Sequence, residues 1–152
     1  MLRVYTIRSI DVAAGTLEVD MVLHPGADTP GASFAETAMP GDVVGMTGPG
    51  GGFLPQARRM LLLGDETALP AMARILENAA PDASATAFIE VDGPAEEQAI
   101  AASCKADIRY LHRHGAPAGT TRLLQDALDS VAAAGITEDL YICCLLYTSD
   151  AA

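Results

Sequence analysis

The strongest signal for the fold of this chain is the stretch 61–71, which reads LLLGDETALPA. An apolar run typical of a buried strand stops at Gly64, which permits a tight turn, and a helix is predicted to begin near Leu69. Thr67 can cap that helix, and Pro70 fits its first turn. Such a strand, turn and helix bring backbone N–H groups and the positive end of a helix dipole to one place, where a nucleotide pyrophosphate can bind.

The second half of the chain, outward from this stretch, alternates predicted strands and helices. Apolar residues recur on one face of each predicted helix, so that each helix can pack on a parallel sheet. This pattern predicts the βαβ arrangement of a nucleotide-binding lobe, with a weaker helical pattern over 96–102. The predicted strands are 60–64, 86–91, 108–112 and 140–142, and the predicted helices are 69–79 and 121–134.

The first half predicts β structure instead. Residues 3–10 and 17–23 alternate apolar and polar side chains and are predicted to pair as a hairpin. A Pro/Gly-rich loop follows, then a helix over 33–38 capped by Ser33, and a strand over 43–47. The sequence GPGGG at 48–52 breaks regular structure and indicates a linker between two lobes. A phosphate loop is the less favoured alternative there, because no Lys-Ser/Thr pair follows it.

Composition narrows the classes of partner. The 152 residues carry a formal net charge of −11, and this negative field repels nucleic acid and anionic lipid. No apolar run approaches the roughly 20 residues that span a bilayer, and no signal peptide is evident, so we expect a cytoplasmic protein without stable membrane association. The three cysteines form no metal-ligand spacing. An anionic cofactor therefore needs local donors, such as backbone N–H groups and the few arginines.

Two strings of residues together resemble the siderophore-interacting proteins. These strings are RVYTIR at 3–8 and GDETALPA at 64–71. The family comprises flavin- and nicotinamide-using ferric-siderophore reductases of the ferredoxin-reductase-like superfamily. The resemblance implies a β-barrel portion plus an α/β lobe: the C-terminal part of a flavin-binding Greek-key barrel over 1–54, followed by a Rossmann-like NAD(P)-binding domain over 55–143.

The two ends are expected to be cut or foreign. Residues 144–152 do not continue the periodicity before them, and they resemble the translation of a sequencing adapter. We therefore expect them to lie outside the fold, and we expect the first barrel strands to be missing. An incomplete flavin pocket would leave the chain poorly active or inactive.

The resemblance places a flavin site on the first string. Arg3, Tyr5, Thr6 and Arg8 match the stretch that holds the flavin in the family. The residue types suit that role, because an arginine pairs with phosphate oxygens, a tyrosine ring stacks on the isoalloxazine, and a threonine can meet its heteroatoms. Without the resemblance, this string would indicate an ordinary edge strand with solvated arginines.

Two further residues are assigned to the flavin by the same resemblance. His24 and Ser33 match family residues that line the pyrophosphate and adenine side of the flavin. The stretch is shorter here than in the family, and Phe34 stands roughly where a tryptophan is expected. A histidine at a strand end is otherwise an ordinary polar turn residue.

The nicotinamide nucleotide is assigned by resemblance to the turn after the first strand of the lobe. The implied residues are Gly64, Asp65, Glu66, Thr67 and Ala68. Their backbone groups suit a phosphate better than the two carboxylates do. The carboxylates have an alternative role, which is to complement the helix dipole.

Arg113 is the candidate for binding an NADP 2′-phosphate. It follows the predicted strand 108–112, at the sheet edge where ligands of open α/β sheets bind. The comparable edge of ferredoxin-reductase-like proteins carries a phosphate-binding arginine. The alternatives for the string YLHRH at 110–114 are a solvated loop or a chance metal-binding pair.

The resemblance implies an FAD-dependent oxidoreductase. Electrons would pass from NADPH or NADH through FAD to a ferric siderophore and release Fe(II), in a protein expected to be a monomer. No side chain need act as acid or base, and no protein-bound metal is expected, because the cofactors carry the chemistry. The alternatives are a general flavin or ferredoxin-type reductase with another acceptor, and a non-catalytic siderophore- or nucleotide-binding module.

Overall fold

The structure is a computed structural model that describes residues 4–23, 30–48, 50, 54–135 and 140–145. Arg3 and His24, two of the predicted flavin ligands, lie outside the described residues. The chain divides into two compact units, Met1–Phe53 (unit 1) and Leu54–Ala152 (unit 2). Among the described residues, no helix is both long and apolar enough to cross a bilayer.

Unit 1 contains the predicted hairpin in a shorter form. Strand β1 (Ile7–Asp11) pairs antiparallel with β2 (Thr16–Val19), and Gly15 occupies the turn with a φ of +67° that favours glycine. Helix α1 spans Pro30–Thr37, so Ser33 lies inside the helix and the prediction that it caps the helix is wrong.

The predicted strand over 43–47 is also wrong. These residues have no regular secondary structure, and Val43 and Val44 are 94% and 60% exposed. The reason is that a short apolar stretch, here VVGMT, does not by itself make a strand. A strand needs a neighbour for its backbone hydrogen bonds, and no described strand pairs with this segment.

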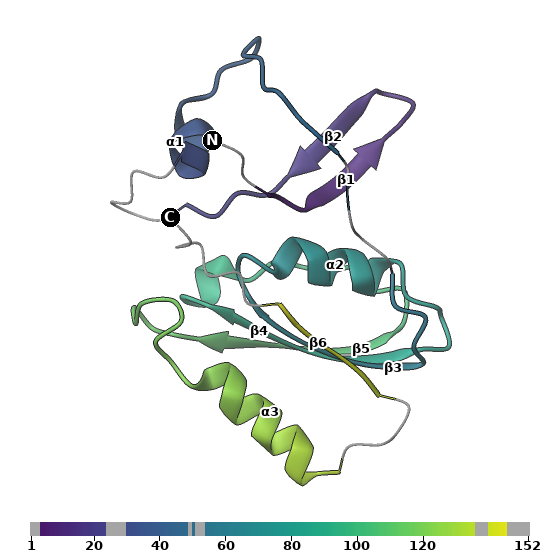
Figure 1. The fold of residues 1–152 in the computed structure, drawn as a ribbon. Helices are drawn as coiled ribbons and strands as arrows, with labels where there is room; N and C mark the ends of the chain where they lie inside the picture. Colours follow the sequence, from purple (N-terminus) through teal and green to yellow (C-terminus); the bar gives the residue numbers. More distant parts are fainter. Residues whose placement is uncertain (1–3, 24–29, 49, 51–53, 136–139, 146–152) are drawn as a thin grey trace. The chain divides into compact units, whose positions relative to one another are not determined.

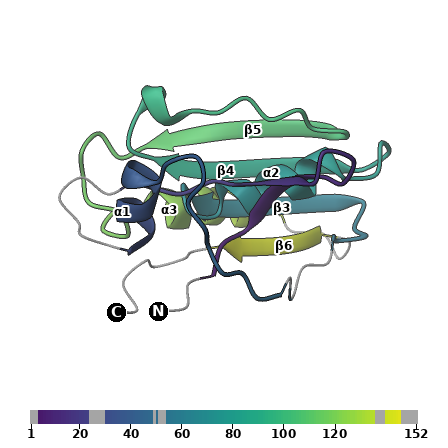
Figure 2. The same cartoon turned by 90° about the horizontal axis from the view of Figure 1, so that it is seen from above.

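Unit 2 is built on a four-stranded parallel sheet with the order β5-β4-β3-β6 (Figure 2). In the register of the central strand, Gly64 lies opposite Ile89 on one side and Leu145 on the other. Strand β6 therefore continues through Cys144 and Leu145, the first residues of the segment predicted to lie outside the fold. The strands are β3 (Arg59–Asp65), β4 (Ser84–Val91), β5 (Lys105–His112) and β6 (Leu140–Leu145).

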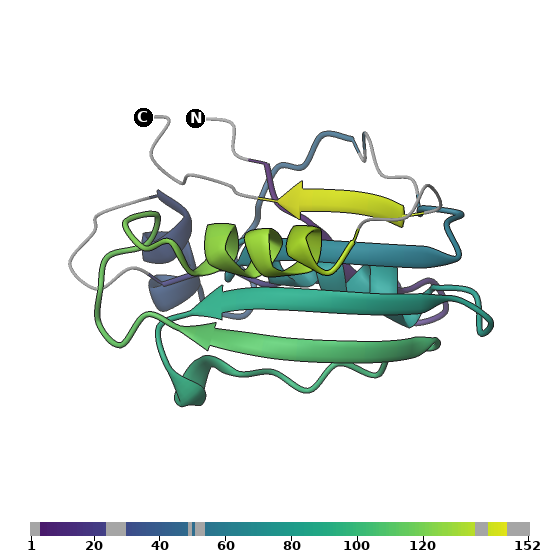
Figure 3. The ribbon, with the colours of Figure 1, turned by 90° about the horizontal axis from the view of Figure 1, so that it is seen from below.

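Two helices cover opposite faces of this sheet (Figure 1). Leu62 of β3 is fully buried in the cluster that contains α2 (Leu69–Glu77). Leu61 and Leu63, which point to the other face, pack with α3 (Leu123–Ala133), the helix that crosses the sheet in Figure 3. The predicted strand and helix arrangement of the lobe is therefore confirmed.

The helical pattern predicted over 96–102 is not realised as a helix. A short 3₁₀ turn, η1 (Pro94–Glu96), is followed by an irregular segment. The backbone of Gln98 makes two hydrogen bonds with the Tyr110 hydroxyl instead, because its N–H donates to that oxygen at 3.2 Å and its carbonyl accepts from it at 2.7 Å. This tertiary contact replaces the helical hydrogen bonds that the local pattern predicted.

Candidate functional site

The carboxyl end of β3 is a topological switch point. The chain leaves β3 through α2 on one face of the sheet, and it enters the neighbouring strand β6 from α3 on the opposite face. In open α/β sheets, this is where ligands bind. The predicted residues Gly64, Asp65, Glu66, Thr67 and Ala68 all lie at this point. The structure therefore places them at one sheet edge, and Arg113 at the end of β5 joins them there.

Side chains of the turn fix its shape. Oδ1 of Asp65 accepts hydrogen bonds from the backbone N–H of Thr67 at 2.9 Å and from its hydroxyl at 2.5 Å. The N–H of Ala68 donates to the carbonyl of Asp65 at 3.0 Å, and Ala68 is the N-cap residue of α2. The prediction that Thr67 is the N-cap residue is therefore wrong by one residue. Asp65 and Thr67 stabilise the turn that precedes the helix.

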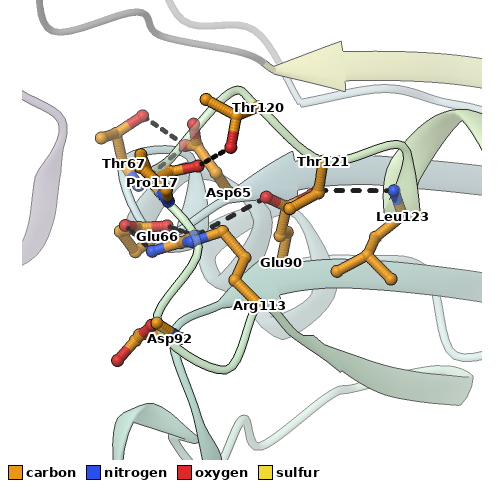
Figure 4. A network of polar contacts seen from close by, with 11 residues as sticks. Asp65, Glu66, Thr67, Glu90, Asp92, Arg113, Pro117, Thr120, Thr121 and Leu123 are labelled. Carbon is orange, nitrogen blue, oxygen red and sulfur yellow. Dashed lines mark hydrogen bonds and ion pairs between the residues drawn. The ribbon is translucent and has the colours of Figure 1, made fainter.

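A buried ion pair joins this turn to the end of β5 (Figure 4). Nη1 and Nη2 of Arg113 each donate to a different carboxylate oxygen of Glu66 at 2.7 Å. The Arg113 side chain is only 6% exposed, and that of Glu66 is 18% exposed. This two-point contact is the strong form of an arginine–carboxylate pair.

A second carboxylate extends the network. Oε1 of Glu90, at the end of β4, lies 3.8 Å from Nη1 of Arg113, and its Oε2 accepts a hydrogen bond from the Thr121 hydroxyl at 2.9 Å. Glu90 is the buried charged residue of the described core. Nε of Arg113 is buried without a hydrogen-bond partner among the described residues. The network therefore joins the carboxyl ends of β3, β4 and β5 to the loop before α3.

The charges around Arg113 favour its protonated form. The hydrogen bonds that Arg113 donates to Glu66 raise the pKa of the Arg113 guanidinium, burial opposes that effect, and the charges of Glu66, Glu90 and Asp92 add to it. Asp92 also orders the loop after Arg113, because its Oδ1 accepts the N–H of Gly115 at 2.8 Å. Both terminal nitrogens of the guanidinium that was predicted to bind a 2′-phosphate therefore donate hydrogen bonds to Glu66.

The two histidines beside Arg113 do not assemble a metal site. Nε2 of His112 lies 2.8 Å from Oε1 of Glu97, and the His112 and His114 rings meet edge to face at 5.7 Å between centroids. In the described part of the chain, no group of three histidine, cysteine or acidic side chains is placed to hold a metal ion.

In unit 1, Tyr5 lies against the start of α1. The Tyr5 hydroxyl oxygen is 1.9 Å from the point where a Cβ on Gly31 would sit, so only glycine allows this approach. The side chain of Tyr5 is 41% exposed. The structure thus brings a predicted flavin ligand next to the helix that carries Ser33.

The other predicted flavin ligands of unit 1 are less closely grouped. Thr6 is half-buried just before β1, and Nε of Arg8 in β1 lies 3.9 Å from Oδ2 of Asp20. The carbonyl of Ser33 accepts the Thr37 hydroxyl at 2.7 Å within α1. These contacts fix backbone positions on the hairpin and the helix.

Glu90, Asp92 and Thr121 are the site residues that sequence reasoning missed. A signal for Glu90 was present, because it interrupts the apolar run 87–91 of a predicted buried strand. A charged side chain in such a run is expected to have a partner, and Arg113 is the nearest candidate at the end of the next strand. Asp92 and Thr121 carry no comparable signal.

Comparisons with known proteins agree on one family. Residues 57–144 match the family described as Siderophore-interacting protein, and residues 1–53 match the Siderophore-interacting FAD-binding domain. An uncharacterized protein of Mycobacterium tuberculosis is 40% identical over 116 residues, which cover 75% of this chain and 41% of that protein. The ferric vibriobactin reductase ViuB of Vibrio cholerae is 34% identical over 113 residues, which cover 73% of this chain and 41% of ViuB. The chain thus spans about 41% of the length of these relatives.

Solved structures give the same answer. A siderophore utilization protein from T. fusca superimposes with a TM-score of 0.78 at 37% identity, over 95% of this chain and 66% of that one. The siderophore-interacting protein SipS from Aeromonas hydrophila gives 0.74 at 26% identity, over 92% and 57% of the two chains. The predicted fold class, a portion of a flavin-binding barrel followed by an α/β lobe, is confirmed. The chain belongs to the siderophore-interacting protein family.

Proposed function

We propose that this chain takes part in electron transfer from NADH or NADPH, through FAD, to a ferric siderophore, which releases Fe(II). One observation carries the proposal: in a chain of this family, the 64–68 turn lies at the switch point of a parallel sheet. That point is where α/β sheets bind nucleotides. Two relatives support the reductase reading by name, a ferric vibriobactin reductase and a ferric acinetobactin reductase.

The nicotinamide nucleotide is assigned to unit 2. The start of α2 supplies the positive end of a helix dipole. Gly64 is a buried residue near the end of β3, so the turn predicted at Gly64 begins instead at Glu66. Residues 64–68 would hold the pyrophosphate mainly through the backbone. The Asp65 carboxylate is already committed to the N–H and hydroxyl of Thr67, which supports a backbone role for this turn.

FAD is assigned to unit 1. The partly exposed Tyr5 ring is available for stacking, and the start of α1 lies beside it. Arg8, whose Nε lies 3.9 Å from Oδ2 of Asp20, is the described arginine that we assign to a flavin phosphate. Thr6 and Ser33, together with Arg3 and His24 outside the described residues, complete the proposed set. These residue types fit the cofactor.

The chain's own residues would bind and orient rather than transfer protons. When bound, the cofactors supply the redox chemistry, which is hydride transfer from nicotinamide to flavin and electron transfer from flavin to Fe(III). Tyr5 would orient the flavin ring, and the 64–68 turn would position the nicotinamide nucleotide. A cytoplasmic location and a monomeric state stay predictions.

The test is a steady-state assay of the full chain reconstituted with FAD. NADH or NADPH oxidation and Fe(II) capture by a ferrous chelator are followed with ferric vibriobactin as acceptor. Siderophore-dependent nicotinamide oxidation with matching Fe(II) supports the proposal. Turnover with dyes or ferredoxin alone would favour a general flavin reductase, and binding without nicotinamide oxidation would favour a non-catalytic module.

A further inference from the structure

We propose that Glu66 makes this site select NADH over NADPH, because it occupies the guanidinium that would otherwise bind a 2′-phosphate. The inference rests on the proposed nicotinamide site in unit 2. It concerns which of the two dinucleotides that site accepts. The selectivity depends on the contacts of Arg113 and on the charges that surround it.

Arg113 is paired at two points with Glu66, and only 6% of its side chain is exposed to a phosphate. Each of its Nη atoms donates to a separate oxygen of Glu66 at 2.7 Å, and Nη1 also lies 3.8 Å from Glu90. The remaining nitrogen, Nε, is buried. A phosphate that took over the two-point contact would have to displace Glu66, whose carboxylate would then lose its partner while only 18% exposed. Leaving a largely buried carboxylate unpaired is unfavourable.

The surroundings of the pair are acidic. Glu66, Glu90 and Asp92 all act on Arg113, and Asp65 lies at the adjacent turn (Figure 4). These are four carboxylates against one guanidinium. A 2′-phosphate would add about −1.5 to −2 charges at neutral pH to this field. Like charges at such distances disfavour NADPH.

These carboxylates repel a 2′-phosphate, but they can accept a hydrogen bond from the 2′-hydroxyl of NADH. Asp92 is exposed directly after the carboxyl end of β4, the strand next to β3. In dinucleotide-binding sheets, an acidic residue at a strand end near the glycine turn accepts a hydrogen bond from the ribose 2′-hydroxyl. A hydroxyl can donate to a carboxylate, whereas a phosphate cannot. The carboxylate at the end of β4 therefore favours NADH, which keeps the ribose 2′-hydroxyl, over NADPH.

The test is a calorimetric measurement of the dissociation constants of NADH and NADPH for the FAD-loaded full chain. The wild type is expected to bind NADH at least about tenfold more tightly than NADPH. Glu66→Gln keeps the shape of the side chain but removes its charge, so it should strengthen NADPH binding and narrow the preference. The matched control, Asp107→Asn, removes the carboxylate of an exposed acid–arginine pair near the start of β5, and it should leave the preference unchanged.

The outcomes separate this inference from the proposed function. A wild type that binds NADPH as tightly as NADH overturns the selectivity while leaving the nicotinamide site intact. An unchanged preference in a folded Glu66→Gln protein overturns the role of Glu66. Binding of neither nucleotide overturns both. Should Glu66→Gln fail to fold, the wild-type preference is measured at rising salt, where a repulsive origin predicts a narrowing preference and a constant preference contradicts it.

Discussion

Unit 2 buries a core of its own, whereas unit 1 buries very little. Leu62, Met72 and Leu76 are fully buried in unit 2, within a cluster that joins the sheet to α2. Among the described residues of unit 1, only Ala32 is buried, and Val12 is 88% exposed. Because apolar burial drives folding, unit 2 should hold its shape alone, while unit 1 should gain much of its order from what binds it.

The proposed nicotinamide site in unit 2 and the proposed flavin site in unit 1 differ in the same way. At the sheet edge of unit 2, a buried ion pair links connections that are far apart in the sequence. In unit 1, the comparable feature is one aromatic side chain against one glycine. Nicotinamide binding should therefore meet a preformed surface, whereas flavin binding should stabilise the residues that contact it.

The largest expected effect comes from removing the cation of the buried network. Arg113→Met leaves Glu66 and Glu90 largely buried without their partner, and we expect unit 2 to lose about 3–5 kcal/mol of unfolding free energy. The measurement is urea unfolding followed by circular dichroism. The control Arg109→Met breaks an exposed pair with Asp107 and should cost much less, because solvent screens such pairs. Equal losses in the two variants would contradict the network's role.

The pH dependence of this variant has a definite sign. The raised pKa of Arg113 means that its contribution is fully present at neutral pH and is lost only in strongly alkaline solution, as the pH rises through the folded-state pKa. The difference in unfolding free energy between wild type and Arg113→Met should therefore be present in full at neutral pH and shrink only in strongly alkaline solution.

A core substitution sharpens the contrast between the units. Leu62→Ala opens a cavity in the fully buried centre of β3, and it should cost about 2–5 kcal/mol in urea unfolding. Val12→Ala removes methyl groups from an 88% exposed side chain of unit 1 and should change stability by less than about 0.5 kcal/mol. A large loss in Val12→Ala would mean that unit 1 buries a core after all.

The smallest expected effect concerns the flavin side. Gly31→Ala places a Cβ 1.9 Å from the Tyr5 hydroxyl, so the ring must move. We expect FAD binding, followed by flavin fluorescence, to weaken by a factor of about 3–10, since ring stacking contributes about 0.5–1.5 kcal/mol. Gly45→Ala is the control, because no atom lies within 4 Å of its added Cβ. Equal affinities in both variants would remove Tyr5 from the flavin site.

Local sequence signals predicted unit 2 well. The apolar run before Gly64 and the helical spacing after it gave β3 and α2 to within a few residues, because both signals come from neighbours in the chain. The failures involve distant partners. Residues 43–47 are apolar enough to suggest a strand, but no strand lies beside them among the described residues, and local sequence does not reveal that neighbour.

The same limit applies to the candidate site. Glu66 and Arg113 are 47 residues apart in the sequence. They meet because β3 and β5 are parallel strands of one sheet, so their carboxyl ends lie at the same end of that sheet. Sequence reasoning therefore named both residues but assigned Arg113 to a phosphate, without seeing that Glu66 lies against it. Glu90 was missed for the same reason, since its contact depends on β4 lying next to β5.

The most direct test of the proposed electron path is an anaerobic absorbance measurement on the full chain loaded with FAD. Adding NADH should bleach the visible flavin band, and adding ferric vibriobactin afterwards should restore it, with Fe(II) appearing in proportion. A chain that retains no FAD, or a flavin band that NADH and NADPH leave unchanged, would contradict the account.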